Sequence, residues 1–187
     1  MRPLLYLDVD GTLLPFGAAG PYPVHEPDHG TPYGGGRVDP DAHPLLTRID
    51  PGLGPRLRAL DCVLVWATTW LDDANEVIAP WLGLPPLPVL DWPDEDEDED
   101  EDGDGDGDGA PGVPGVSGGR GVHWKTRHLV AHADGRPFVW LDDEITAADH
   151  AWVGAHHPGR ALLHRVDHRR ALTGADFDAV RGWLSAA

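Results

Sequence analysis

The sequence predicts an α/β fold in which helices cover both faces of a mostly parallel sheet. Segments with helix start signals lie between or after most of the strand-like segments. The strand-like segments are continuously apolar rather than alternating, as expected for strands covered on both faces. Strands that alternate with helices indicate a doubly wound architecture. The five expected strands are Leu4–Val9, Cys62–Ala67, Leu87–Leu90, Phe138–Leu141 and Ala161–Val166.

Local signals predict where several helices begin. Asp50 followed by Pro51 predicts a helix running to about Leu60, because Asp is common at the cap and Pro at the first helical position. Three further starts are predicted from Thr and Asp at capping-box spacing. These pairs are Thr69 with Asp72, Thr146 with Asp149, and Thr173 with Asp176, the last opening a C-terminal helix.

Two segments interrupt the alternation. Residues 15–44 are rich in Gly, Pro and His, and we expect an irregular flap there. Residues 93–121 are expected to form a disordered acidic and Gly/Pro-rich linker. The run at 94–108 has twelve acidic residues, so the chain's net charge of -18 is mostly local. Strand-like segments lie on both sides of this linker, which predicts that residues 1–187 form a single domain.

Composition excludes several classes of protein. The single cysteine, Cys62, excludes an internal disulfide and a zinc site built from cysteines. The N-terminus lacks the apolar length of a signal peptide, and no apolar stretch approaches the length of a membrane span. We therefore expect a cytoplasmic location and no membrane partner.

The segment LYLDVDGTLL at residues 5–14 places two carboxylates at the end of the first predicted strand. Asp8 and Asp10 are two positions apart, so alternation along a strand directs their side chains to the same side. Gly11 then permits a turn, and Thr12 adds a hydroxyl. Carboxylates at the carboxyl end of a strand in an open α/β sheet lie where ligands bind. One carboxylate can attack phosphorus to form an aspartyl-phosphate while its neighbour transfers protons.

Asp-x-Asp-Gly-Thr after an N-terminal apolar strand resembles motif I of the haloacid dehalogenase (HAD) superfamily, and three further motifs follow in their usual order. VLVWAT, ending in Thr68, resembles motif II. HWKTRHLV contains Lys125, the only lysine of the chain, and resembles motif III. WLDDE, with Asp142 and Asp143, resembles motif IV. The resemblance implies a Rossmann-like sheet of five strands, numbered along the chain, in the order 5-4-1-2-3.

The resemblance also implies a role for each motif residue. Asp8 is expected to be the nucleophile, and Asp10 the acid that protonates the leaving group and then activates water. Lys125 offsets charge on the phosphate. Of the adjacent hydroxyls of Thr68 and Thr69, one is expected to bind phosphate and the other to cap the following helix. The spacing to the acid at 72 favours Thr69 as the cap, and the choice stays open at this point.

A magnesium ion completes the set of groups that the resemblance implies. Asp8, the main-chain carbonyl of Asp10, and Asp142 can hold a Mg²⁺ that keeps several waters, as this cation prefers. Asp143 supports the metal through water or by orienting its ligands. Four tryptophans in or beside the motifs are expected to pack in the core beneath the site: Trp66, Trp70, Trp124 and Trp140.

The expected activity is Mg²⁺-dependent hydrolysis of a phosphomonoester. An acid at the second position of motif I, here Asp10, is typical of phosphatases and phosphotransferases and argues against dehalogenation. Phosphotransfer to another acceptor, or a regulatory module that binds metal or a phosphorylated ligand without turnover, are the alternatives.

Members of the HAD superfamily differ in cap domains, which are inserted after motif I or between motifs II and III. Neither of the corresponding insertions in this chain is long enough for a full cap domain, so the resemblance implies an open site and a large substrate. A finer resemblance, to the HAD domains of RNA-repair proteins, lies in WATTW, LPPLPVLDWP, GVHWKTRHLV and WLDDE. It suggests a phosphate at the end of a nucleic acid. The acidic run argues against a nucleic-acid partner, because it repels polyanions.

Overall fold

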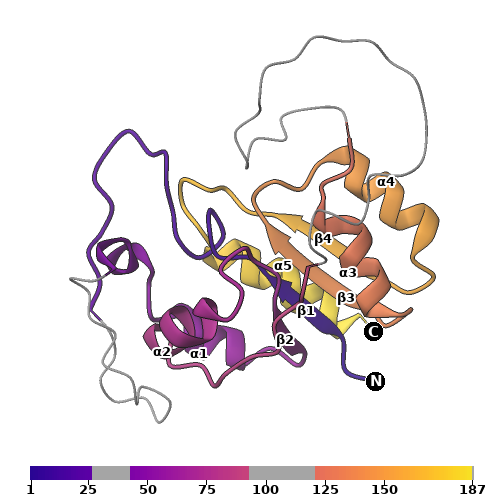
Figure 1. Ribbon diagram of the computed structural model, residues 1–187, viewed down its shortest axis with the longest axis horizontal. Helices are drawn as coiled ribbons and strands as arrows, with labels where there is room; N and C mark the ends of the chain where they lie inside the picture. The colour runs from indigo at the N-terminus through magenta and orange to yellow at the C-terminus, as the bar shows by residue number, and fades with distance from the viewer. Residues whose placement is uncertain (27–42, 93–120, 187) are drawn as a thin grey trace.

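A four-stranded parallel sheet forms the centre of the computed structural model, which describes residues 1–26, 43–92 and 121–186 (Figure 1). The strand order is β2-β1-β3-β4, so that β1 and β3 are the two central strands. Every neighbouring pair is parallel. The strands are β1 (Leu4–Leu7), β2 (Val63–Trp66), β3 (Phe138–Asp142) and β4 (Ala161–Arg165).

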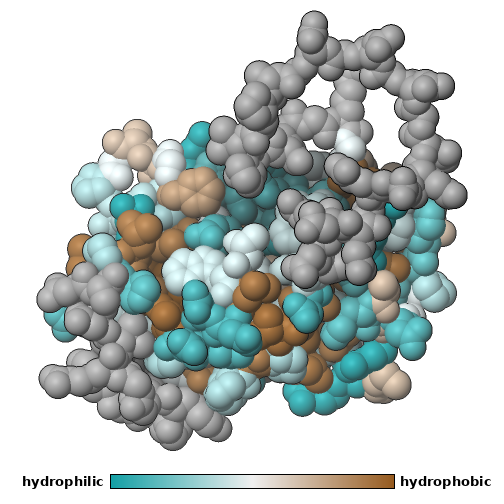
Figure 2. Space-filling model, viewed as in Figure 1, coloured by the Kyte–Doolittle hydropathy of each residue, from teal (hydrophilic) through white to brown (hydrophobic). Residues whose placement is uncertain are grey.

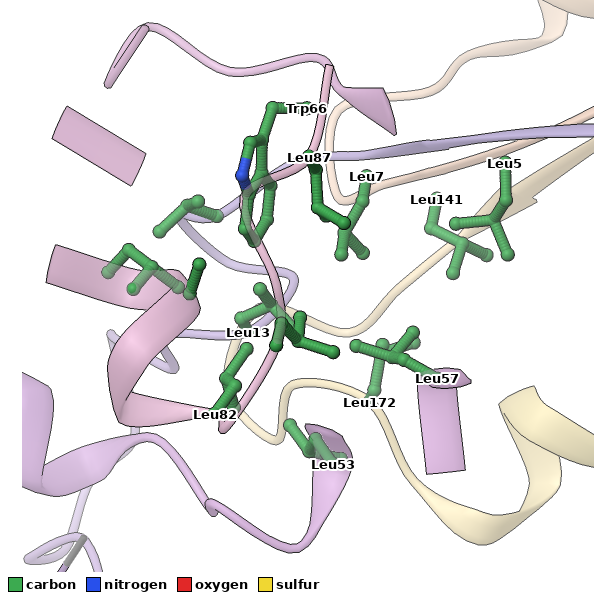
Figure 3. Packing of buried hydrophobic residues seen from close by; sticks show 14 of the residues in the cluster. Leu5, Leu7, Leu13, Leu53, Leu57, Trp66, Leu82, Leu87, Leu141 and Leu172 are labelled. Atoms are coloured by element: carbon green, nitrogen blue, oxygen red, sulfur yellow. The ribbon is translucent and has the colours of Figure 1, made fainter. Parts of the chain in front are cut away.

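Helices cover both faces of the sheet, as the apolar segments predicted. Because successive side chains of a strand point to opposite faces, the core divides into two layers. Leu5 and Leu7 of β1 pack in the same layer as residues of α1, α2 and α5 (Figure 3). Leu4 and Tyr6 lie in the other layer, with α3 and α4. The helices are α1 (Leu53–Arg58), α2 (Ala79–Trp81), α3 (Lys125–Ala133), α4 (Ala147–His156) and α5 (Gly174–Ser185).

Two shorter helical segments complete the described elements. A 3₁₀ helix, η1 (Pro44–Arg48), precedes α1, and a π-helical turn, η2 (Ala74–Ile78), runs directly into α2. No helix in these parts of the chain is both long enough and apolar enough to cross a lipid bilayer. On the surface, polar and apolar residues are mixed over the face seen in Figure 2.

The expected strand at Leu87–Leu90 is wrong: this segment makes only one isolated parallel bridge, between Trp66 and Val89. Pro88 has no amide hydrogen to give to a ladder. The amide of Leu87 donates instead to the Asn75 side chain, at 2.8 Å. The described residues therefore form four strands rather than the expected five.

The predicted helix starts have mixed outcomes. The capping boxes at Thr146 and Thr173 are confirmed. The helix expected from Asp50 to about Leu60 is shorter, because Asp50 accepts the Gly52 amide at 2.8 Å in a turn that precedes α1. The expected cap at Thr69 is wrong, since turns occupy the chain from there until η2 begins. Most of the expected flap and linker lies outside the described residues; residues 15–26 have no regular secondary structure.

Candidate active site

Acidic side chains meet at the carboxyl ends of the two central strands. Asp8 directly follows β1, and Asp142 is the last residue of β3. Their carboxylates and that of Asp143 each offer an oxygen within 4.8 Å of the others. All three side chains are buried. The parallel register of β1 and β3 therefore brings together acids that are more than 130 positions apart in the sequence.

Lys125 lies between two of these acids. Its Nζ donates to Asp8 Oδ1 and to Asp142 Oδ2, both at 2.8 Å, and only 4% of the residue is exposed. Burial lowers the pKa of this lysine, but the two carboxylates outweigh that effect and raise the pKa above its usual value. The side chain is thus an ammonium ion, which is held between a carboxylate at the end of β1 and a carboxylate at the end of β3.

The electrostatic balance of the cluster favours a cation. Burial raises the pKa of Asp8 to about 7, with Lys125 opposing the rise and Asp142 adding to it. Burial, with the negative charges of Asp142 and Glu144, raises the pKa of Asp143 to about 6. The three carboxylates lie close together and one ammonium contacts two of them, so negative charge is in excess and the carboxylates repel one another. Their oxygens are the ligands that Mg²⁺ prefers, and the donor set fits that ion. Asp10 stays a predicted ligand through its main-chain carbonyl, since this group contains side-chain oxygens only.

Gly11 makes room for Asp143 beside Asp8. Its φ is +72°, a conformation that only glycine adopts readily. A Cβ at this position would collide with the carboxylate of Asp143. On the other side, Arg165 Nε donates to the main-chain oxygen of Asp143 at 2.8 Å, which anchors the residue from β4.

Asp10 is half-buried and is held by an indole. Trp70 Nε1 donates to Asp10 Oδ2 at 2.9 Å. An indole can only donate, so this oxygen is the acceptor. Thr68 is fully buried, and its hydroxyl accepts the Trp70 amide at 3.3 Å. Thr69 is exposed and caps no helix.

The tryptophans are only partly the core residues that the sequence suggested. Trp66 and Trp140 are fully buried, whereas Trp70 is half-buried and 42% of Trp124 is exposed. Trp140 has a polar contact as well, because its Nε1 donates to Asp142 Oδ2 at 3.2 Å. The expectation of a core position is therefore wrong for Trp124.

A histidine that was not predicted as a site residue contacts the backbone of the lysine. His123 is buried, its Nδ1 accepts the main-chain amide of Lys125 at 3.1 Å, and its Nε2 lies 3.1 Å from Glu144 Oε2. With Nδ1 as the acceptor, Nε2 bears the hydrogen that is donated to the carboxylate. His123 and Glu144 also form a possible metal-ligand group with Asp142, which both groups share. In the sequence, His123 and Glu144 are distinguished only by their positions beside the lysine motif and the acid motif.

One hollow in the described surface lies away from these acids. It has a volume of about 540 Å³ and is lined by residues from 17–24 and 44–48. None of the clustered acids lines it. The polar cluster therefore lies outside this hollow.

Comparison of the chain with protein-family models, curated proteins and solved structures finds no match. The geometry and chemistry of the residues described above are therefore the basis for assigning a function.

Proposed function

We propose that the chain is a Mg²⁺-dependent phosphomonoester hydrolase of the HAD type, which acts through an aspartyl-phosphate on Asp8. The main support is the contact of the Lys125 ammonium with both Asp8 and Asp142, at 2.8 Å each. A buried carboxylate paired with an ammonium beside two further acids is the set of groups that phosphoryl transfer requires.

The strand order of the HAD type is part of this proposal. In the order 5-4-1-2-3 the third strand lies beside β2, and the single bridge between Trp66 and Val89 supports that neighbour for the 87–90 segment, although the segment forms no regular strand. Four parallel strands in the order β2-β1-β3-β4 are compatible with the rest of that order. The fold alone does not define an activity, so the proposal depends on the acids and the lysine.

In the first step, a carboxylate oxygen of Asp8 attacks the phosphorus while the bond from phosphorus to the ester oxygen breaks. Asp10 gives its proton to the departing alkoxide, which leaves as an alcohol. Lys125 offsets the negative charge of the transferring phosphoryl group, and Thr68 would orient that group. The product of this step is the phosphoryl ester of Asp8.

In the second step, water attacks the phosphorus of the aspartyl-phosphate. Asp10, now ionised, accepts a proton from the water as the bond from phosphorus to Asp8 breaks, and inorganic phosphate is released. Asp8, Asp142 and Asp143 would hold the Mg²⁺. When bound, this ion supplies positive charge that lowers the repulsion between the carboxylates and the phosphate.

The test is phosphate release from a panel of sugar phosphates, nucleotides, phosphopeptides, and 3′- and 5′-phosphorylated oligonucleotides, with and without Mg²⁺. We expect Mg²⁺-dependent release and a preference for large substrates. Asp8→Asn should abolish turnover, whereas Asp178→Asn, an exposed acid on α5, should not. Mass spectrometry should find one added phosphoryl group on the peptide that contains Asp8.

The outcomes separate this proposal from its rivals. No release from any substrate, with tight binding of a phosphate analogue, would indicate a regulatory binding module. Product that forms only when an acceptor alcohol is added would indicate a phosphotransferase. Turnover that survives in Asp8→Asn would exclude Asp8 as the nucleophile.

A further inference from the structure

A fully buried carboxylate outside the acid cluster belongs to the first turn of α4. Asp149 has 0% exposure. Its Oδ2 accepts the Thr146 amide at 2.8 Å and the Thr146 hydroxyl at 2.7 Å. These bonds form the capping box that the spacing predicted, and they involve only one of the two oxygens.

The second oxygen of Asp149 contacts a different helix. Oδ1 accepts the His123 amide at 2.7 Å and the Thr126 hydroxyl at 2.6 Å. Lys125 lies between these two residues and begins α3. The same carboxylate thus binds the start of α3 and the start of α4. Because α4 follows directly after Asp142 and Asp143, these bonds connect the lysine motif to the acid motif.

The charge of Asp149 suits this position. Burial raises the pKa of the carboxyl, but the hydrogen bonds from Thr126, Thr146 and the His123 amide outweigh that effect and lower the pKa below its usual value. An ionised carboxylate accepts through both oxygens, and four donors contact it here. Neutral substitutes lose part of this capacity.

We propose that Asp149 is a positioning residue, which holds the start of α3 against α4 so that Lys125 reaches Asp8 and Asp142 together. A lysine side chain is long and flexible, so its ammonium is held in one place only if its backbone is fixed. Asp149 fixes the residues on both sides of Lys125. The consequence for catalysis rests on the proposed hydrolase function, whereas the geometric claim does not.

The chain offers a matched control for the Asp149 variant. Asp149→Asn keeps the size of the side chain but replaces one of the two acceptor oxygens by an NH₂ group, which then faces hydrogen-bond donors. Asp176 makes the same capping box with Thr173 on α5, at 2.7 and 2.6 Å, without contacting α3. Asp176→Asn therefore removes an equivalent cap on the other face of the sheet, together with the contact of Asp176 Oδ1 with His164 Nε2 at 2.7 Å. Thr126→Val breaks only the bond from α3, and it is the second test variant if Asp149→Asn does not fold.

A single lysine allows the position of the ammonium to be measured without any assay of activity. Because Lys125 is the only lysine of the chain, labelling with [¹⁵N]lysine gives one ε-ammonium signal and one backbone amide signal in NMR spectra. In the wild type, burial and two ion pairs should slow the exchange of the ammonium hydrogens with water. Asp149→Asn and Thr126→Val should shift the signal and speed the exchange about tenfold or more, the effect expected for losing a bond to a charged group. Asp176→Asn should leave the signal unchanged.

Turnover provides the second measurement. With a substrate from the panel, Asp149→Asn and Thr126→Val should lower kcat about tenfold with a smaller change in KM, since Lys125 acts most strongly on the transition state. Asp176→Asn should change kcat by less than about twofold.

Two results would overturn the positioning role: a lysine signal that Asp149→Asn and Thr126→Val leave unchanged, or one that Asp176→Asn alters equally. An unchanged kcat in the two variants of an active enzyme would also overturn it. A wild type without activity on any substrate counts against the hydrolase, and the lysine signal then decides the positioning role.

Discussion

Replacing Lys125 by Met removes the ammonium that contacts both Asp8 and Asp142 while keeping an unbranched side chain of similar length. The lysine and the two acids are 4%, 6% and 1% exposed, so water cannot take the place of the lost charge without a rearrangement. The variant should therefore fold less stably, and the size of the loss measures how firmly the cluster is paired.

Removing one partner of a buried ion pair typically lowers the free energy of unfolding by about 3–5 kcal/mol. Two carboxylates lose their partner here, so we expect a value within that range at pH 8, with EDTA present. Without the lysine, the pKa of Asp8 in the folded state rises further above its unfolded value. Such a group favours folding at low pH and opposes it as the pH rises. The difference between wild type and variant should therefore shrink when the pH is lowered from 8 to 5.

Urea unfolding followed by tryptophan fluorescence measures this difference. The matched control is Arg181→Met, which removes an ion pair with Asp178 on the surface of α5, where the side chains are 48% and 76% exposed. An exposed pair contributes about 0–1 kcal/mol, so the control should lose little. A loss below about 1 kcal/mol for Lys125→Met, with the same dependence on urea as the wild type, would show that the buried pairing is wrong.

Three further substitutions test separate parts of the structure. Gly11→Ala should lower the free energy of unfolding by about 1–2 kcal/mol because of the left-handed backbone, and by about 1–3 kcal/mol more because the Asp143 carboxylate is displaced. It should also reduce turnover. Urea unfolding measures the loss of stability, and phosphate release measures the loss of turnover. Trp70→Phe removes the donor to Asp10 and should lower kcat by about 10- to 100-fold without a large change in stability; an unchanged kcat would exclude a role in orienting the acid. Asp176→Asn should cost about 1 kcal/mol at pH 7. Burial raises the pKa of Asp176, but hydrogen bonds, chiefly from the capping threonine, lower it below its usual value. The difference from wild type should therefore fade below about pH 4, as unfolding curves at pH 7, 4 and 2.5 would measure.

The strands that form the floor of the site could be predicted because their apolar residues are continuous and their ends bear acids. β1 and β3 lie where the apolar segments placed them, to within two residues. The capping boxes at Thr146 and Thr173 formed because each depends on residues three positions apart. Local chemistry of this kind is complete within a few residues of sequence, which is why it could be recognised there.

In both failures, the hydrogen bonds that form differ from those that the sequence pattern predicts. Leu87–Leu90 has the apolar residues of a strand, but Asn75 takes one of its amides and Pro88 lacks another. Thr69 has the spacing of a cap, but the turn after β2 brings the hydroxyl of Thr68 to the Trp70 amide instead. The contact of Leu87 with Asn75, 12 positions away, is not visible in the local pattern, whereas Pro88 and Thr68 are part of the local sequence.

The same reasoning explains why the lysine needs an anchor that the acids do not. Asp8 and Asp142 adjoin central strands with neighbours on both sides, so the ladder fixes their backbones. Lys125 begins a helix on one face of the sheet, and no ladder fixes its backbone. If the ammonium were displaced, the buried carboxylates would lose their partner and repel one another. A carboxylate that ties α3 to α4 supplies the missing constraint, and it can do so because α4 begins just after the acids that the lysine must reach.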